Sequence, residues 1–170
     1  LIELGGTIGD IESLPFTETL RQFAYEHKNN VCFVHVSLVP FLDTTNEEKT
    51  KPTQESVQKL RSFGISPDIL VVRGKTLSIE TQKKLSFFCQ IPESNIFLNP
   101  DLPSIYEVPQ SFLDQKMLDA VFINLKLKPR QEVDLSWWNI TTKIQKSVRY
   151  NIGNIPKIKI AIVGKYTGLK

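Results

Sequence analysis

The sequence of 170 residues has little of what defines several classes of protein. Its two cysteines, Cys32 and Cys89, are too few for a disulfide framework and are not spaced like metal ligands. Both lie among apolar neighbours, which favours buried, reduced thiols. No apolar run reaches the roughly 18 residues of a membrane span, and no charged segment leads into an apolar one as in a signal peptide. We therefore expect a soluble, cytoplasmic protein that does not bind membranes.

An excess of charge of one sign is also absent. The chain has 21 basic and 18 acidic side chains, a net charge of +3, so no general attraction to nucleic acid is expected. Neither GxGxxG nor GxxxxGK[ST] occurs, and with them two common phosphate-binding loops are missing from these residues. A hydrophobic content of 41% and a charged content of 23% are ordinary for a globular domain.

The residues that are present alternate between short apolar runs and amphipathic stretches. Residues 69–72 form a continuous apolar run, which is typical of a buried parallel strand, and Ser78 is suited to cap the helix that follows. Strands separated by helices predict parallel βαβ units, and hence an α/β fold with a doubly wound parallel sheet. We expect strands at residues 31–39, 69–72 and 96–98, helices at residues 16–25, 55–63 and 78–88, and two further helical stretches that fill residues 110–127.

The two ends have a different character. Residues 1–4 are typical of the last part of a strand, and residues 158–163 of a strand that opens a new unit, so we expect both ends to lie inside larger structures. Between them, Trp137, Ile140, Ile144 and Val148 share one helical face and predict a tethering helix. The expected divisions are residues 1–128, a linker at 129–156, and the start of another domain at 157–170.

A glycine-rich segment with three carboxylates, residues 3–12, carries the densest chemical signal. In open α/β sheets ligands bind beyond the carboxyl ends of strands, and glycines let a backbone approach a ligand closely. Glu3, Asp10 and Glu12 together call for a counter-ion, such as the Mg²⁺ that accompanies a nucleotide. The alternative is a glycine turn whose acids face water or stabilise the N-terminus of the next helix.

A second segment, residues 49–54, follows the strand at 31–39 and precedes a helix. It supplies two lysines, two threonine hydroxyls and an amide, stiffened by a proline. Ammonium groups and a helix N-terminus suit phosphate oxygens, and Gln54 could read a base edge. The alternative is a solvated loop whose charges merely face water.

Other polar residues carry weaker signals. Arg73 ends the strand at 69–72, and Lys83 and Lys84 lie on the next helix; each alone favours a solvated cation. His35 alternates within an apolar strand, which favours a core histidine with a satisfied ring. The pair Trp137-Trp138 is more typical of packing than of ligand binding.

Several motifs together resemble the CTP synthase family. They follow in the order and nearly the spacing of that family along almost the whole chain, and the first and third are highly specific together. The motifs are ELGGTIGDIESLPF at 3–16, SLVP at 37–40, KTKPTQ at 49–54, PDIL at 67–70, FC at 88–89, SIY at 104–106, VP at 108–109 and VGKY at 163–166.

The resemblance implies roles for individual residues. Glu3 matches a Mg²⁺ ligand beside the phosphates of ATP, and Lys84 a further nucleotide-contacting lysine. Positions that match contacts of the UTP substrate or the CTP inhibitor are Asp10, Ile11, Glu12, Lys49, Thr50, Lys51, Pro52, Thr53 and Gln54. Positions that match the surroundings of the ATP adenine are Pro100, Asp101 and Leu102, although Pro100 lacks a backbone donor.

The resemblance also implies a reaction and partners. In that family ATP phosphorylates O4 of UTP, and ammonia released from glutamine by a second domain displaces the phosphate to give CTP. It implies a P-loop NTPase or dethiobiotin synthetase-like fold, Mg²⁺, and a homo-tetramer. This chain would be an internal fragment from the second half of the synthetase domain, inactive alone, with residues 157–170 starting the glutaminase domain.

Two other functions compete with this interpretation. One is a related ATP-dependent amidoligase, such as a dethiobiotin synthetase relative, which should lack the segment at 49–54. The other is a non-catalytic module that senses pyrimidine nucleotides and has no phosphate-binding loop of its own.

Overall fold

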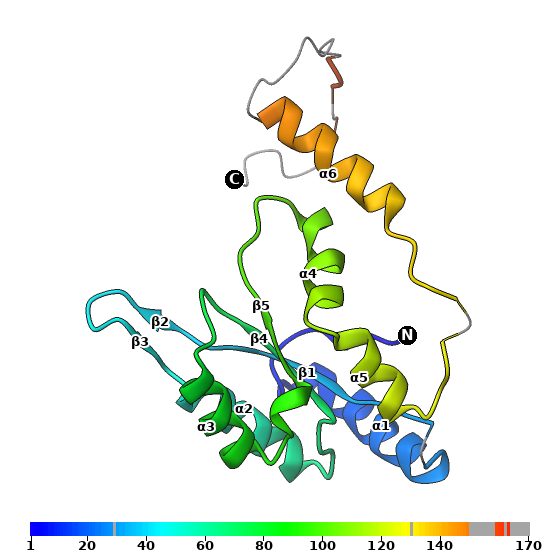
Figure 1. Cartoon of the computed structure of the whole chain (residues 1–170). Coiled ribbons are helices and arrows are strands. Elements are labelled where there is room, and N and C mark those ends of the chain that lie inside the picture. The colour runs from blue at the N-terminus through cyan, green and yellow to red at the C-terminus, as the bar shows by residue number, and fades with distance from the viewer. Residues whose placement is uncertain (29, 130, 150–158, 162, 164–170) are drawn as a thin grey trace.

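The computed structural model describes residues 1–28, 30–129, 131–149, 159–161 and 163 (Figure 1). The α-helices are α1 (Leu14–Glu26), α2 (Lys51–Ser62), α3 (Ile79–Cys89), α4 (Val108–Asp114), α5 (Met117–Asn124) and α6 (Ser136–Arg149). The strands are β1 (Val34–Leu38), β2 (Phe41–Leu42), β3 (Glu47–Glu48), β4 (Ile69–Arg73) and β5 (Ile96–Asn99). Three 3₁₀ turns are η1 (Ile11–Ser13), η2 (Glu93–Asn95) and η3 (Ile105–Glu107).

The central sheet has three parallel strands in the order β1-β4-β5. Leu38 of β1 stands beside Arg73 of β4, which in turn stands beside Asn99 of β5. The carboxyl ends of all three strands therefore meet at one edge of the sheet. β2 and β3 form a separate antiparallel hairpin that projects beyond this edge (Figure 1).

Helices cover both faces of this sheet. On one face α2 and α3 pack side by side (Figure 1), and their Val57 and Leu85 are fully buried against Leu70 and Val72 of β4. On the other face Ile69 and Val71 meet side chains of α4 and α5, including Ala120, Phe112 and Val121. Alternate residues of β4 thus supply two cores, which confirms the predicted doubly wound α/β fold.

Most of the predicted elements form, with two corrections. α2 begins at Lys51, four residues before the expected start, because Pro52 occupies its first turn, where the fixed φ of proline suits a helix. Residues 1–4 form no strand in the described structure, so that expectation is wrong. The expected cap of α3 is confirmed, since the Ser78 hydroxyl accepts a hydrogen bond from the Thr81 amide.

The predicted helix in residues 129–156 is confirmed as α6. It rests on η3 through Trp138 against the Tyr106 ring, an ion pair of Lys146 with Glu107, and a hydrogen bond from Ser104 to Gln145. Trp137, Ile140 and Ile144, the expected packing face, are exposed. The strand expected at 158–163 falls partly outside the described residues; residues 159–161 and 163 have no strand. Within the described ranges, no helix is long and apolar enough to cross a membrane.

Candidate functional site

A pocket lies at the edge of the sheet where the parallel strands end. Its volume is about 270 Å³, close to the roughly 300 Å³ at which small-molecule sites begin. Ligands of open α/β sheets bind at this edge, so the pocket stands where a ligand is expected. Its lining residues are Leu38, Val39, Pro40, Phe41, Asp43, Arg73, Gly74, Lys75 and Asp101.

Arg73 organises one wall of this pocket. Its guanidinium donates to the carbonyl oxygens of Asn99 at 2.6 Å and Pro100 at 3.0 Å, and it forms an ion pair with Asp101. The planar guanidinium holds several acceptors at once. Arg73 therefore fastens the loop after β5 to the end of β4, and its interpretation as a solvated cation is wrong.

The segment at residues 49–54 joins the hairpin to α2. Lys51 and Pro52 are exposed, whereas Thr50, Thr53 and Gln54 are buried. Thr50 is the N-cap residue of α2 but makes no side-chain cap, so the N-terminus of the helix is uncapped. An uncapped N-terminus beside two lysines suits an anion.

The buried residues of this segment have partners within the protein. The Thr53 hydroxyl donates to the Leu38 carbonyl at 2.9 Å and accepts from Ser37, and the Gln54 amide donates to the Thr50 hydroxyl at 3.0 Å. These bonds tie the first turn of α2 to the end of β1. The two lysines of the segment are the groups left to meet a ligand, each beside an acid: Lys49 lies 2.6 Å from Glu47, and Lys51 lies 3.9 Å from Glu55.

Glu48 links the hairpin to the N-terminus of α3. Its two carboxylate oxygens accept hydrogen bonds from the Thr76 hydroxyl at 2.6 Å, the Ser78 amide at 3.0 Å and the Ser78 hydroxyl at 2.7 Å. Burial acts to raise the pKa of Glu48, but hydrogen bonds from Thr76, Thr81 and Ser78 outweigh it and lower the pKa to about 2. The carboxylate is thus a firmly charged acceptor.

The glycine-rich segment at residues 3–12 forms a tight turn. Gly6 and Gly9 have φ angles of 83° and 102°, the positive values expected of glycine there. The Asp10 carboxylate accepts from the Thr7 amide at 2.9 Å, and the Asp10 amide donates to the Thr7 carbonyl at 3.0 Å. Asp10 therefore braces the turn, while Glu3 and Glu12 are exposed.

The structure does not bring the two segments together. A Cβ on Gly9 would lie 2.7 Å from Cε of Lys59, eight residues after Lys51 and so about 12 Å further along the axis of α2. No hydrogen bond or ion pair joins residues 3–12 to residues 49–54 in the part of the chain that the structure describes. Among those same residues, no group of three or more His, Cys, Asp or Glu side chains is arranged to hold a metal ion.

The weaker candidates mostly have structural roles. His35 is buried, its Nε2 lies 2.9 Å from the Ser56 hydroxyl, and burial lowers its pKa, which confirms a core histidine. Cys89 is buried as expected, but Cys32 is only partly so; burial, then the Asp68 carboxylate, raises the Cys32 pKa to about 11. Lys84 is exposed on α3.

Sequence reasoning missed Glu48. It lies between Glu47 and Lys49, and such a charged run is typical of a solvated surface loop. Only the hairpin, which turns alternate side chains to opposite faces, separates exposed Glu47 from half-buried Glu48. The sequence signal that could have pointed to Glu48 is the position of two acids directly before Lys49-Thr50-Lys51.

Comparison with known proteins gives a consistent result. The family model described as CTP synthase N-terminus matches residues 1–127. The CTP synthase of Pelagibacter ubique is 43% identical over 172 residues, covering 100% of this chain and 31% of the relative. That of Dictyostelium discoideum is 41% identical, covering 99% and 32%, and that of Chlamydia muridarum is 43% identical, covering 98% and 30%. The chain spans about a third of the length of these curated relatives.

Proposed function

The chain belongs to the CTP synthase family, and from this premise we propose that it is part of an enzyme that aminates UTP to CTP at the expense of ATP. The nitrogen comes from glutamine or ammonia, and the reaction passes through UTP phosphorylated at O4. The observation that carries the proposal is the family match over residues 1–127, which includes both chemical segments and the strands that end at the pocket.

The place of the chain within the family is part of the proposal. The matching model describes the N-terminus of CTP synthase, not an internal region as we expected. Within that N-terminal part we assign residues 1–128 to the second half of the synthetase domain and residues 129–156 to a linker that contains α6. The assignment of residues 157–170 to a glutaminase domain lies mostly outside the described residues.

The pyrimidine nucleotide is assigned to residues 49–54 and to Lys84. Lys49 and Lys51 stand at the uncapped N-terminus of α2 and would meet its phosphates. The buried members of the segment hold this turn against β1. Asp10, Ile11 and Glu12 are assigned to CTP on the family resemblance alone, because they lie at the other end of α2.

ATP is assigned to the edge of the sheet, and Mg²⁺ is assigned to Glu3 on the family resemblance. Asp101 lines the pocket beside Arg73 and, with Pro100 and Leu102, would flank the adenine. Mg²⁺ bound together with substrate phosphates needs only one or two carboxylates from the protein. Exposed Glu3 fits that requirement as a single ligand. Bound Mg²⁺ would neutralise charge that develops during phosphoryl transfer.

Assembly and location follow from the same premise. We propose a homo-tetramer in the cytoplasm, with CTP as a feedback inhibitor and glutamine-derived ammonia as the nitrogen source. The CTP synthase match disfavours the dethiobiotin synthetase-like alternative.

The test is made with the protein expressed from its complete coding sequence. CTP should form from UTP, ATP, Mg²⁺ and ammonia. Lys51→Ala should weaken UTP binding and CTP inhibition together by about 1.5–3 kcal/mol, the loss of one charged hydrogen bond, while ATP affinity at saturating UTP changes little. A solvated lysine would matter by less than about 0.5 kcal/mol. Binding of UTP and CTP without any CTP formation would instead identify a nucleotide-sensing module.

A further inference from the structure

The hairpin β2–β3 contributes Phe41 to the pocket, and its second strand leads directly into the proposed pyrimidine segment. Its second strand ends at Glu48, and the segment begins at the next residue, Lys49, whose amide donates to the Pro40 carbonyl at 2.8 Å. Any displacement of Glu48 therefore moves Lys49 directly. The contacts that hold this hairpin therefore also determine the positions of the lysines in residues 49–54.

Two sets of contacts tie the hairpin to the turn after β4. Lys75 forms an ion pair with Asp43 at 2.7 Å and lies over the Phe41 ring at 4.6 Å from its centroid. The side chains of this ion pair are 62% and 79% exposed, and pairs so exposed contribute little. The second set is the cluster of hydrogen bonds that Glu48 accepts from Thr76 and Ser78. These hydrogen bonds are exposed as well, but three of them meet on one carboxylate of a partly buried residue. Several charge-assisted hydrogen bonds on one group hold it more firmly than a single exposed ion pair does.

The Glu48 carboxylate also stands at the N-terminus of α3. It accepts from the amide and hydroxyl of Ser78, the N-cap residue of that helix. A negative charge there is favoured by the positive end of the helix dipole. α3 carries Lys84, the other lysine assigned to the pyrimidine nucleotide. One carboxylate thus connects both elements that carry these cations.

The segment is held at its far end as well. The Thr53 hydroxyl donates to the Leu38 carbonyl and fixes the first turn of α2 to β1. Between its two ends Thr50 is buried and accepts from the Gln54 amide, whereas the side chains of Lys51 and Pro52 are exposed on the first turn of α2. The lysines are therefore placed by two anchors, one on each side.

We infer that Glu48 is a positioning residue: it fixes residues 49–52 relative to α3, so that Lys49, Lys51 and Lys84 face the same pyrimidine nucleotide. This inference rests on the proposed function of the segment. It assigns no contact between Glu48 and the nucleotide, since its carboxylate oxygens are already occupied by Thr76 and Ser78. The effect of Glu48 is on binding of UTP and CTP, not on the chemistry that follows.

Glu48→Gln is the informative change, with Glu48→Asp and Thr76→Val as companions. Glutamine keeps the shape but loses the charge, and one of its two acceptor positions becomes an amide donor facing other donors. Aspartate keeps the charge with a shorter reach. Thr76→Val removes a single donor and leaves the carboxylate intact.

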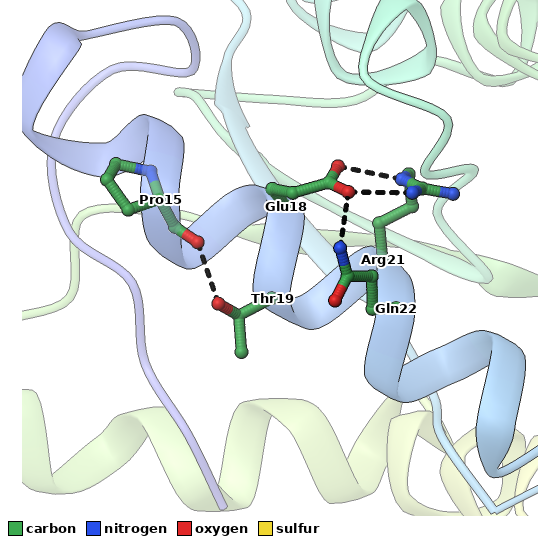
Figure 2. Close-up of polar contacts among 5 residues, drawn as sticks. All are labelled: Pro15, Glu18, Thr19, Arg21 and Gln22. Atoms are coloured by element: carbon green, nitrogen blue, oxygen red, sulfur yellow. Dashed lines mark hydrogen bonds and ion pairs between the residues drawn. The ribbon is translucent and has the colours of Figure 1, made fainter.

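Glu18 provides a matched control. Figure 2 shows its carboxylate accepting hydrogen bonds from Arg21 at 2.8 and 2.7 Å and from Gln22 at 2.8 Å. These hydrogen bonds, those from Arg21 foremost, lower its pKa to about 2, as in Glu48. All of its partners lie within α1, however, so Glu18→Gln loses a comparable cluster of hydrogen bonds without touching the hairpin.

The experiment uses the protein expressed from its complete coding sequence. Steady-state kinetics give the KM for UTP, the KM for ATP, kcat and the CTP concentration for half-inhibition. Glu48→Gln should raise both the KM for UTP and the CTP concentration for half-inhibition by roughly three- to tenfold, the effect of losing one or two hydrogen bonds. Kcat and the KM for ATP should stay within about twofold, as for substitutions away from a site. Thr76→Val should raise the same two quantities by a smaller factor than Glu48→Gln does. Glu18→Gln should leave both unchanged.

Hydrogen exchange of the amides in residues 49–54 gives a second readout. Glu48→Gln should speed exchange there in the absence of nucleotide, and Glu18→Gln should not. The inference would be overturned if Glu48→Gln changed neither the KM for UTP, nor the CTP concentration for half-inhibition, nor the amide exchange in residues 49–54. It would also be overturned if kcat and the affinity for UTP fell equally.

Lys51→Ala separates failure of the inference from failure of the proposed function. If Lys51→Ala weakens UTP binding and Glu48→Gln does not, only the role of Glu48 is wrong. If neither change affects UTP, the segment does not bind the nucleotide, and the proposal on which the inference rests is wrong. Should Glu48→Gln fail to fold, Glu48→Asp and Thr76→Val decide in the same way, since either must weaken UTP binding for the inference to stand.

Discussion

Two carboxylates of this protein, Glu18 and Glu48, have a pKa lowered to about 2 for different reasons. Glu18 is exposed, and its partners Arg21 and Gln22 lie on the same helix (Figure 2). Glu48 is half-buried, and its partners lie some 30 residues away along the chain. The hydrogen bonds of both clusters are exposed to solvent, which screens them, but only those of Glu48 join segments that are distant in the sequence. A similar pKa therefore does not mean a similar contribution to folding.

Acid unfolding should reveal this difference. The ordinary pKa of Glu48 is 4.5 and its pKa in the folded protein is about 2, so its charged form favours the folded state. Its contribution is complete above pH 4.5 and is lost as the pH falls toward 2. In Glu48→Gln, the free energy of unfolding from urea titrations should be lower at pH 6 and depend less on pH between 4.5 and 2. A steeper loss in that interval than in the unchanged protein would contradict this.

A second change at the residue scale concerns Glu3. In the protein from its complete coding sequence, Glu3→Ala should abolish CTP synthesis and spare glutamine hydrolysis. On the proposed function a Mg²⁺ ligand would be lost, and metal stabilisation of phosphoryl transfer is worth several kcal/mol, whereas the proposed glutaminase chemistry would need no Mg²⁺ from Glu3. Both activities are measured on one preparation, CTP by absorbance and glutamate by a coupled assay. Equal loss of both would show that Glu3 is structural.

At the scale of elements, the sequence predicted the framework better than the site. Continuous apolar runs and helical spacing identified β1, β4, β5 and the helices, because burial on both faces leaves a strong pattern. The start of α2 was missed because Lys51, Thr53 and Gln54 are polar, so that no apolar periodicity marks its first turn. The burial of Thr53 depends on Leu38, 15 residues earlier, and no local pattern reports such a contact.

Thr53 tests whether its hydroxyl supports the fold. It is fully buried, and it donates to Leu38 at the end of β1. Thr53→Val keeps the volume but leaves the Leu38 carbonyl without this donor, which should lower the free energy of unfolding by about 1–3 kcal/mol. Urea denaturation of the two proteins measures the difference. Thr19→Val is the control, because Thr19 is exposed and donates only to Pro15 within α1 (Figure 2). Equal stability of Thr53→Val and the unchanged protein would exclude this structural role.

At the scale of the whole molecule, the helices cover the sheet unevenly. On the face where α4 and α5 bury Ile69 and Val71 of β4, the neighbouring residues of β1 remain exposed. Val34, Val36 and Leu38 are 42%, 58% and 57% exposed, and several apolar side chains of α1 are also exposed. An apolar surface of this kind marks an interaction site or a site prone to aggregation. The described residues thus form a sheet with two cores that still exposes apolar surface.

The same view of the whole molecule predicts what these 170 residues do alone. Transfer of the γ-phosphoryl group requires backbone amides and a lysine that cradle the phosphates of ATP, and no GxxxxGK[ST] loop occurs in the sequence. The pocket at the ends of the strands offers Arg73 and Lys75, but each of these cations is already paired with a carboxylate, Asp101 and Asp43. The isolated chain, incubated with UTP, ATP, Mg²⁺ and ammonia, should therefore yield no CTP, while the protein from the complete coding sequence, assayed in parallel, should yield it. Circular dichroism of the isolated chain establishes that it is folded in the assay. Sustained CTP formation by the folded chain would mean that its own residues cradle the phosphates of ATP. The claim that these residues lack the phosphate-binding part of the enzyme would then be wrong.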